Sequence, residues 1–145
     1  VNMVSAPAIA QSRGIAVSTV RHDRPCDYLT LLRLTVEDEG RSRVMAGTLF
    51  AGDKPRLIDI QGINVEAEFA PTMLYVRNYD RPGFIGALGT VVGDAGLNIA
   101  TFHLGRRDDS GEALALVEVD GEIDDDLLAK VRGLPQVVRV NVLKC

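Results

Sequence analysis

The segment 78–86, which reads NYDRPGFIG, contains the residues whose types and spacing best suit ligand chemistry. Pro82 is typical of the first turn of a helix, and Gly83 and Gly86 leave room for a small ligand beside the helix backbone. The N–H groups of a first turn attract anions, and the carboxylate of Asp80 can bind a cation next to them. The helix start could bind the carboxylate of a ligand, and the aspartate could bind its ammonium group. Together they indicate a receptor for an amino-acid zwitterion. Asp80 acting at or near the N-cap explains much of the same pattern, so both interpretations stay open.

The helix predicted to follow, up to Gly96, has glycine at four positions near one face. A face without side chains allows another backbone or a ligand to come close. We expect tight packing against a neighbouring element to account for Gly89 and Gly93. The glycines do not form the GxGxxG pattern, so no dinucleotide site is predicted.

The composition is that of a folded protein and excludes several classes. Of the 145 residues, 46% are hydrophobic and 25% are charged, and the formal net charge of -4 disfavours a nucleic-acid partner. No apolar run approaches the roughly 20 residues of a membrane span, and the start of the chain lacks the basic leader of a signal peptide. Two cysteines do not make a disulfide scaffold, so we expect a cytoplasmic protein without a membrane partner.

Signals for metal binding and catalysis are weak. Cys26, Cys145, His22 and His103 lack the spacing of a zinc site, so we expect no metal. His103 falls on a predicted strand without a nucleophile nearby, which favours a structural role over that of a general base. We therefore predict no catalytic residue in this chain.

The first 70 residues predict a short helix followed by an antiparallel sheet. The helix, over 1–13, has Val4, Ala8 and Ile9 on one face and Gly14 where a C-cap belongs. We expect this helix to back the sheet. Residues that favour strands, separated by short polar turns, predict four strands. These strands are expected at 28–36, 43–50, 56–60 and 64–69.

The pattern changes near Ala70, and the rest of the chain predicts strand, helix, strand, strand, helix and strand. This is the order of the split ferredoxin-like unit. The predicted fold class is therefore α+β, with a small antiparallel-sheet domain over 1–70 followed by a ferredoxin-like βαββαβ domain over 71–145. The strands are expected at 72–77, 99–104, 113–119 and 136–143, and the helices between Pro82 and Gly96 and over 124–132.

The segment 79–106, YDRPGFIGALGTVVGDAGLNIATFHLGR, closely resembles the ACT domain of the D-3-phosphoglycerate dehydrogenase family, which opens serine biosynthesis. The match continues in ALALVEVD at 113–120. VNMVSAPAIAQSRGI and RVMAGTLF resemble the intervening domain of the same enzymes, which is also similar to a domain of iron–sulfur serine dehydratases. The resemblance implies an intervening domain over 1–70, truncated at its N-terminus, and an ACT domain over 71–145.

The resemblance also implies an effector site. In the family, L-serine is a feedback inhibitor that binds between the ACT domains of neighbouring subunits. Asp80 matches the motif residue, Asn78 lies where relatives carry His or Tyr, and Asn98 matches an asparagine that reaches the ligand from the partner subunit. The backbone over 83–85 can donate to a carboxylate. The implied effector site comprises Asn78, Asp80, Arg81, Pro82, Gly83, Phe84, Ile85 and Asn98.

The resemblance implies a larger parent enzyme as well. ACT domains would join two copies into a homodimer with a shared sheet, and the parent enzyme would be a tetramer. The catalytic and NAD-binding domains would precede Val1, so this chain would bind no cofactor and be inactive by itself, whereas the parent would be an NAD-dependent oxidoreductase. In some relatives the intervening domain holds a phosphate-bearing effector, and Arg56 is in about the right place for such a second anion site.

Several alternatives stand beside this interpretation. Asn78 is shorter than the usual residue, which favours a purely structural assembly module without an effector. The regulatory part of an L-serine dehydratase would need cluster-binding cysteines, and none with suitable spacing occurs in the sequence. A nucleic-acid binder is disfavoured by the acidic charge and by the lack of an aromatic strand motif. If the effector site is intact, the ligand is serine, glycine or another amino acid.

Overall fold

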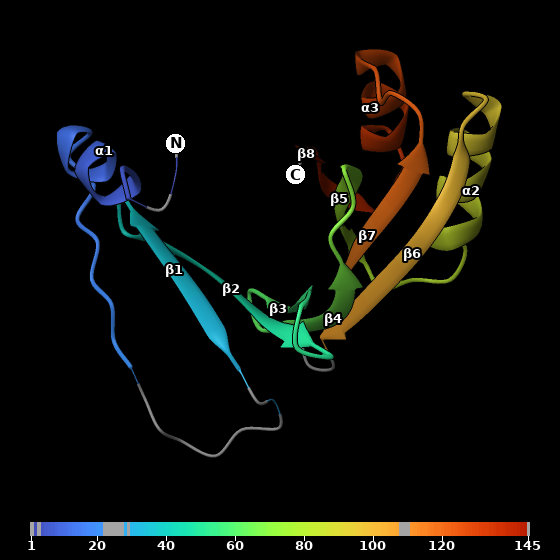
Figure 1. Ribbon diagram of the computed structural model, residues 1–145. Helices are drawn as coiled ribbons and strands as arrows, with labels where there is room; N and C mark the ends of the chain where they lie inside the picture. The colour runs from blue at the N-terminus through green and yellow to red at the C-terminus, as the bar shows by residue number, and fades with distance from the viewer. Residues whose placement is uncertain (1, 3, 22–27, 29, 108–110, 145) are drawn as a thin grey trace.

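The computed structural model describes residues 2, 4–21, 28, 30–107 and 111–144. The strands form two antiparallel sheets of four, one from each half of the chain (Figure 1), and the expected α+β class is confirmed. None of the helices that the structure describes has the length and apolar character needed to cross a bilayer. Cys26, Cys145 and His22 lie outside the described residues.

The first sheet is a meander with the strand order β1-β2-β3-β4. Two of its turns, Glu39-Gly40 and Gln61-Gly62, have positive φ at both residues, the conformation that suits the twist of a two-residue hairpin. All four expected strands are present, although the first starts later than expected. They are β1 (Leu32–Asp38), β2 (Arg41–Phe50), β3 (Lys54–Ile60) and β4 (Ile63–Glu68).

The helix α1 (Ala6–Ser12) is shorter than expected and does not back the sheet, so that expectation is wrong. None of its residues is buried, Val4 before it is 90% exposed, and α1 contacts none of the other described helices and strands. A short helix rich in alanine can bury little apolar area, so its docking would contribute little free energy. The helix ends as expected, because Gly14 has a φ of 70° and the N–H of Ile15 donates to the carbonyl of Ala10.

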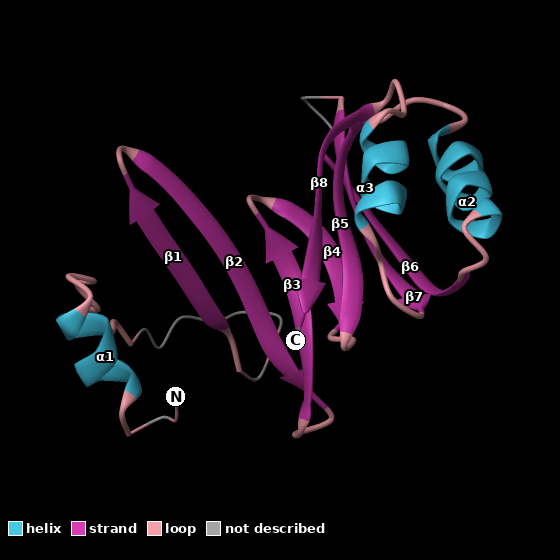
Figure 2. Ribbon diagram, turned by 90° about the horizontal axis from the view of Figure 1, so that it is seen from above, coloured by secondary structure: helices cyan, strands magenta, loops and turns pink. Residues whose placement is uncertain are grey.

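The second sheet has the strand order β6-β7-β5-β8, and α2 and α3 cover one of its faces (Figure 2). This is the ferredoxin-like βαββαβ unit expected from the sequence. Leu74 and Val76 of the sheet pack in one core with Leu88 and Leu127 of the two helices. The elements are β5 (Thr72–Tyr79), α2 (Phe84–Asp94), β6 (Asn98–Arg107), β7 (Glu112–Asp120), α3 (Asp125–Arg132) and β8 (Val137–Lys144).

The two sheets meet where β4 lies against β6 and β7. Ile63 of β4 shares a second core with Leu114 and Leu116, which lie on the face of the second sheet opposite to the helices. Gly105 permits this contact, because a Cβ at that position would lie 2.2 Å from the carbonyl oxygen of Asn64. The face of the second sheet without helices is thus partly covered by the first sheet.

Candidate functional site

The corner between β5 and α2 holds most of the predicted effector residues. The N-cap of α2 is Gly83, whose φ is 89°, and no described side chain caps the helix. Pro82 therefore precedes the helix instead of lying in its first turn, and Asp80 is not the N-cap, so both expectations are wrong. Glycine at the N-cap tolerates the left-handed conformation. The N–H groups of the first turn have no side-chain cap from the described residues, and free N–H groups at a helix start are the arrangement that binds anions.

Asp80 forms an ion pair with Arg106 of β6. Two nitrogens of Arg106, Nε and one terminal nitrogen, each lie 2.6 Å from Oδ2 of Asp80. This pair directs the carboxylate towards β6, so Asp80 does not cap the start of α2. Both contacts use the same oxygen, and Oδ1 has no hydrogen bond to a described residue. Sequence reasoning missed Arg106, although it belongs to the Leu-Gly-Arg triplet of the family pattern.

Asn78 is the only fully buried polar side chain among the described residues, with 2% of its surface exposed. It follows Leu74 and Val76 on the face of β5 that the helices cover. Its Nδ2 donates to the carbonyl of Tyr79 at 3.0 Å, whereas Oδ1 is buried and receives no hydrogen bond from the described residues. A buried acceptor without a donor costs about 1–3 kcal/mol, so a donor on a ligand would be favoured here.

The remaining side chains of this corner differ in exposure. The guanidinium of Arg81 lies 5.5 Å from the centre of the Tyr79 ring, a cation–π contact. Phe84 is 3% exposed and belongs to the core, whereas Ile85 is 55% exposed. Phe84 can therefore serve a ligand through its backbone N–H only.

Asn98 lies at the other end of the same domain. It begins β6, and its Nδ2 donates to Oδ2 of Asp120 at 2.9 Å. Arg106, which holds Asp80, lies near the opposite end of β6, roughly 25 Å away at the usual rise of about 3.3 Å per residue. One chain therefore brings together Asn78, Asp80 and the start of α2, but not Asn98.

The glycine face of α2 is open within the chain. A Cβ placed at Gly86, Gly89 or Gly93 would meet no atom within 4 Å. The expectation that tight packing accounts for Gly89 and Gly93 is therefore wrong for contacts within one chain, because no described element covers this face.

Arg56, the residue expected to mark a second anion site, lies on β3. Its guanidinium pairs with Glu68 at 2.5 Å and lies 4.6 Å from the centre of the Phe50 ring. Its Nε is buried and has no hydrogen bond to the described residues. Both partners lie on the strands that neighbour β3, so these contacts join strands of one sheet. An anion site at Arg56 stays a prediction.

Comparison with known proteins matches both halves of the chain. Residues 1–61 match the family model of the D-3-phosphoglycerate dehydrogenase intervening domain, and residues 72–136 match the family model of the ACT domain. The first match covers β1 to β3 and ends before β4, the second covers β5 to α3 and ends before β8, and both agree with the resemblance noted in the sequence.

Curated relatives named D-3-phosphoglycerate dehydrogenase align with nearly the whole chain. The protein of Bacillus subtilis is 28% identical over 145 residues, covering 99% of this chain and 27% of the relative. The Methanocaldococcus jannaschii protein has the same identity and coverage. The Archaeoglobus fulgidus protein is 33% identical over 142 residues, covering 95% of this chain and 26% of the relative, so the chain spans about a quarter of their length. The chain therefore belongs to the family of D-3-phosphoglycerate dehydrogenases, of which it contains an intervening domain and an ACT domain.

Proposed function

We propose that this chain is the regulatory and oligomerisation part of an NAD-dependent D-3-phosphoglycerate dehydrogenase and that it binds L-serine as a feedback effector. The observation that best supports this proposal is the buried Oδ1 of Asn78, which has no donor among the described residues. Asn78 lies near the end of β5, the strand that leads to the start of α2, which no described side chain caps. The carboxylate of Asp80 lies between them in the sequence and keeps one oxygen without a described partner.

Each polar group of serine has a counterpart at this corner. The N–H groups at the start of α2 can donate to the ligand carboxylate, which the helix dipole also favours. Oδ1 of Asp80 can accept from the ammonium group, and Oδ1 of Asn78 can accept from the ammonium or the hydroxyl. Hydrogen bonds to charged groups contribute about 1.5–3 kcal/mol each, so a few of them give measurable affinity for a small ligand.

A second copy of the chain would complete the site. β6 is an edge strand of its sheet, and edge strands readily pair with another copy. Antiparallel pairing of two β6 strands about Phe102 would set Asn98 of one copy opposite Arg106 of the other. Because Arg106 holds Asp80, this pairing supports a site shared across the interface of a homodimer.

The rest of the proposal concerns the whole enzyme. We place the boundary between the two domains of this chain at residues 70/71, in the connection between β4 and β5. Both described sheets are antiparallel, whereas dinucleotide-binding folds use a parallel sheet. NAD binding and hydride transfer would therefore belong to other domains of a cytoplasmic, tetrameric enzyme, and this chain alone would be inactive.

Isothermal titration calorimetry of the 145-residue chain with L-serine tests the effector site. We expect saturable heat at millimolar serine. Asp80→Asn should weaken the affinity by about tenfold or more, because it removes the charged acceptor. Asp94→Asn, at the other end of α2, is the matched control and should bind as the wild type does.

Light scattering with and without serine tests the shared interface. We expect dimers, with a larger dimer fraction in the presence of serine because the ligand would contact both copies. Dimers that give no heat with serine would leave the structural assembly module as the function. Monomers at high concentration would overturn the shared site. The dehydrogenase names of the relatives favour this family over an L-serine dehydratase.

A further inference from the structure

The strand β1 is the outer edge of the first sheet. In the order β1-β2-β3-β4 it lies farthest from β4, the strand that contacts the second sheet. β1 therefore projects away from the second sheet (Figure 2), and among the described helices and strands it contacts only β2. The backbone N–H and C=O groups on its outer side have no partner among the described residues. An edge of this kind readily pairs with another strand.

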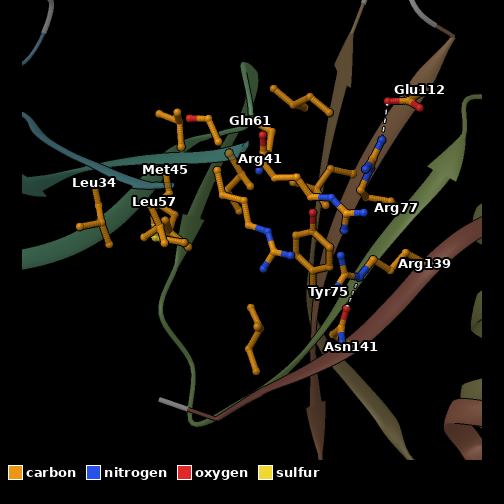
Figure 3. A pocket seen from close by; sticks show the side chains of 18 of the residues that line it. Leu34, Arg41, Met45, Leu57, Gln61, Tyr75, Arg77, Glu112, Arg139 and Asn141 are labelled. Atoms are coloured by element: carbon orange, nitrogen blue, oxygen red, sulfur yellow. Dashed lines mark hydrogen bonds and ion pairs between the residues drawn. The ribbon is translucent and has the colours of Figure 1, made fainter. Parts of the chain in front are cut away.

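One face of β1 carries a row of apolar side chains. All seven residues of the strand are exposed, and side chains two positions apart leave the same face of the sheet. Leu32, Leu34 and Val36 share one face and are 76%, 53% and 50% exposed. Met45 of β2 lies beside Leu34 on this face (Figure 3). A contiguous apolar surface on an edge strand indicates a place where another protein surface binds.

The other face of β1 carries two opposite charges in a symmetrical arrangement. Arg33 and Glu37 lie two positions before and two positions after Thr35. Neither makes an ion pair or a hydrogen bond through its side chain with a described residue. Charged residues usually keep edge strands apart, and like charges directly opposite each other repel. These two charges differ in sign, so a two-fold axis through Thr35 would set each against its counterpart in a second copy.

We propose that β1 is a contact surface for a second copy of this chain, with the two β1 strands paired antiparallel about Thr35. In this register Arg33 of each copy lies opposite Glu37 of the other, and Leu34 lies opposite Val36. A centre at Leu34 would place Arg33 opposite Thr35, and a centre at Val36 would place Glu37 opposite Thr35. Only the centre at Thr35 pairs the two charges with each other, so the charges select one register.

The contact is self-complementary and differs from the one proposed for the serine site. A two-fold axis forms each contact twice, which gives two ion pairs and two pairs of Leu34 with Val36. The apolar faces of both copies lie on the same side of the joined sheet. The serine site would be shared through β6, which is an edge of the other sheet. Because one copy can use both edges, β1 pairing would join β6 dimers into larger assemblies at high protein concentration.

Disulfide cross-linking tests the centre of the contact. In a chain with Cys26→Ser and Cys145→Ser, the further change Thr35→Cys places two thiols opposite each other across the two-fold axis. Residues opposite each other in an antiparallel pair have Cα atoms about 4.5–5.5 Å apart, which a disulfide can span. We expect most of this variant to become a disulfide-linked dimer on mild oxidation, as seen by electrophoresis without reductant.

Ser42→Cys in the same background is the matched control, because Ser42 is exposed and lies on β2 of the same hairpin. In the joined sheet both β1 strands lie between the two copies of Ser42. At about 4.8 Å per strand the two would be at least roughly 14 Å apart, so this variant should stay unlinked. Equal cross-linking of both variants would indicate random collision and overturn the proposal. An unlinked Thr35→Cys variant with the circular dichroism spectrum of the wild type would overturn it too.

Reversing the charges tests the register. In the Thr35→Cys background, Arg33→Glu sets like charges opposite each other and should slow cross-linking by about tenfold. Adding Glu37→Arg exchanges the two charges and should restore the original rate. A double variant as slow as the single one would refute the pairing of Arg33 with Glu37. Asp80→Asn should leave the rate unchanged, so this result does not depend on whether serine binds.

Discussion

Replacing Gly105 with alanine tests the contact between the two sheets. The added Cβ would lie 2.2 Å from the carbonyl oxygen of Asn64, 2.6 Å from Cγ2 of Ile63 and 2.8 Å from Cγ1 of Val65. Carbon contacts are normally about 3.5–4.0 Å, so β4 would have to move away by roughly 1 Å or more. Overpacking of a core costs about 1–3 kcal/mol, and the loss here should be near 3 kcal/mol because the nearest atom belongs to the backbone.

Urea unfolding followed by circular dichroism measures this loss. With an m-value of about 2 kcal/mol per molar urea, a loss of about 3 kcal/mol lowers the midpoint by about 1.5 M. Gly93→Ala is the matched control, since it adds the same methyl group where a Cβ meets nothing within 4 Å. Alanine favours a helix over glycine by up to about 1 kcal/mol, so the control should raise the midpoint.

The two substitutions should thus change stability in opposite directions. A Gly105→Ala variant that unfolds at the wild-type urea concentration, alongside a Gly93→Ala variant that behaves as expected, would refute the close approach of β4 to β6. A loss in both variants would instead indicate that the glycine face of α2 is covered in solution, for example by a second copy of the chain.

Two further predictions concern the two faces of β5. Asn78→Leu should raise the free energy of unfolding by about 1–2 kcal/mol, because it removes a buried acceptor that has no described donor, and it should abolish the heat of serine binding. A loss of stability in that variant would mean that Oδ1 is already satisfied. Burial raises the pKa of Tyr75 above its usual value of 10.0, so the folded state disfavours the phenolate. The resulting stability is present below about pH 10 and is lost as the pH rises through the folded pKa, so urea midpoints of the wild type should fall faster than those of Tyr75→Phe above about pH 10. Midpoints that stay a constant distance apart at alkaline pH would contradict this assignment.

Local sequence patterns determined most of the secondary structure. The order of the strands and helices and the place of the change near Ala70 follow from alternation, helical spacing and turn residues. The Gln61-Gly62 turn is an example, because its backbone conformation depends on its own two residues and the flanking strands. The helix over 6–12 was also predictable, but its position against the sheet was not, since docking depends on the apolar area that it can bury.

The effector corner was predictable only in part. The spacing of Asp80 and Gly83 indicated a helix start with an anion site, and the family resemblance added Asn78 and Asn98. The prediction that Asp80 lies at or near the N-cap was wrong, because its carboxylate forms an ion pair with Arg106, which is 26 residues farther along the chain. A local pattern cannot reveal a competing partner that another strand supplies.

The tertiary structure alone decided the contact at Gly105 and the gathering of five arginines around a pocket of about 680 Å³ between the two sheets (Figure 3). These are Arg41, Arg43, Arg77, Arg107 and Arg139. The arginines of the pocket come from β2, β5, β6 and β8, and each is an ordinary polar residue within its own strand. They meet because the register of each sheet and the packing of β4 on β6 place these four strands, together with their neighbours, around one space. Contacts of this kind join residues far apart in the chain, so they depend on how whole sheets pack and not on the spacing of neighbouring residues.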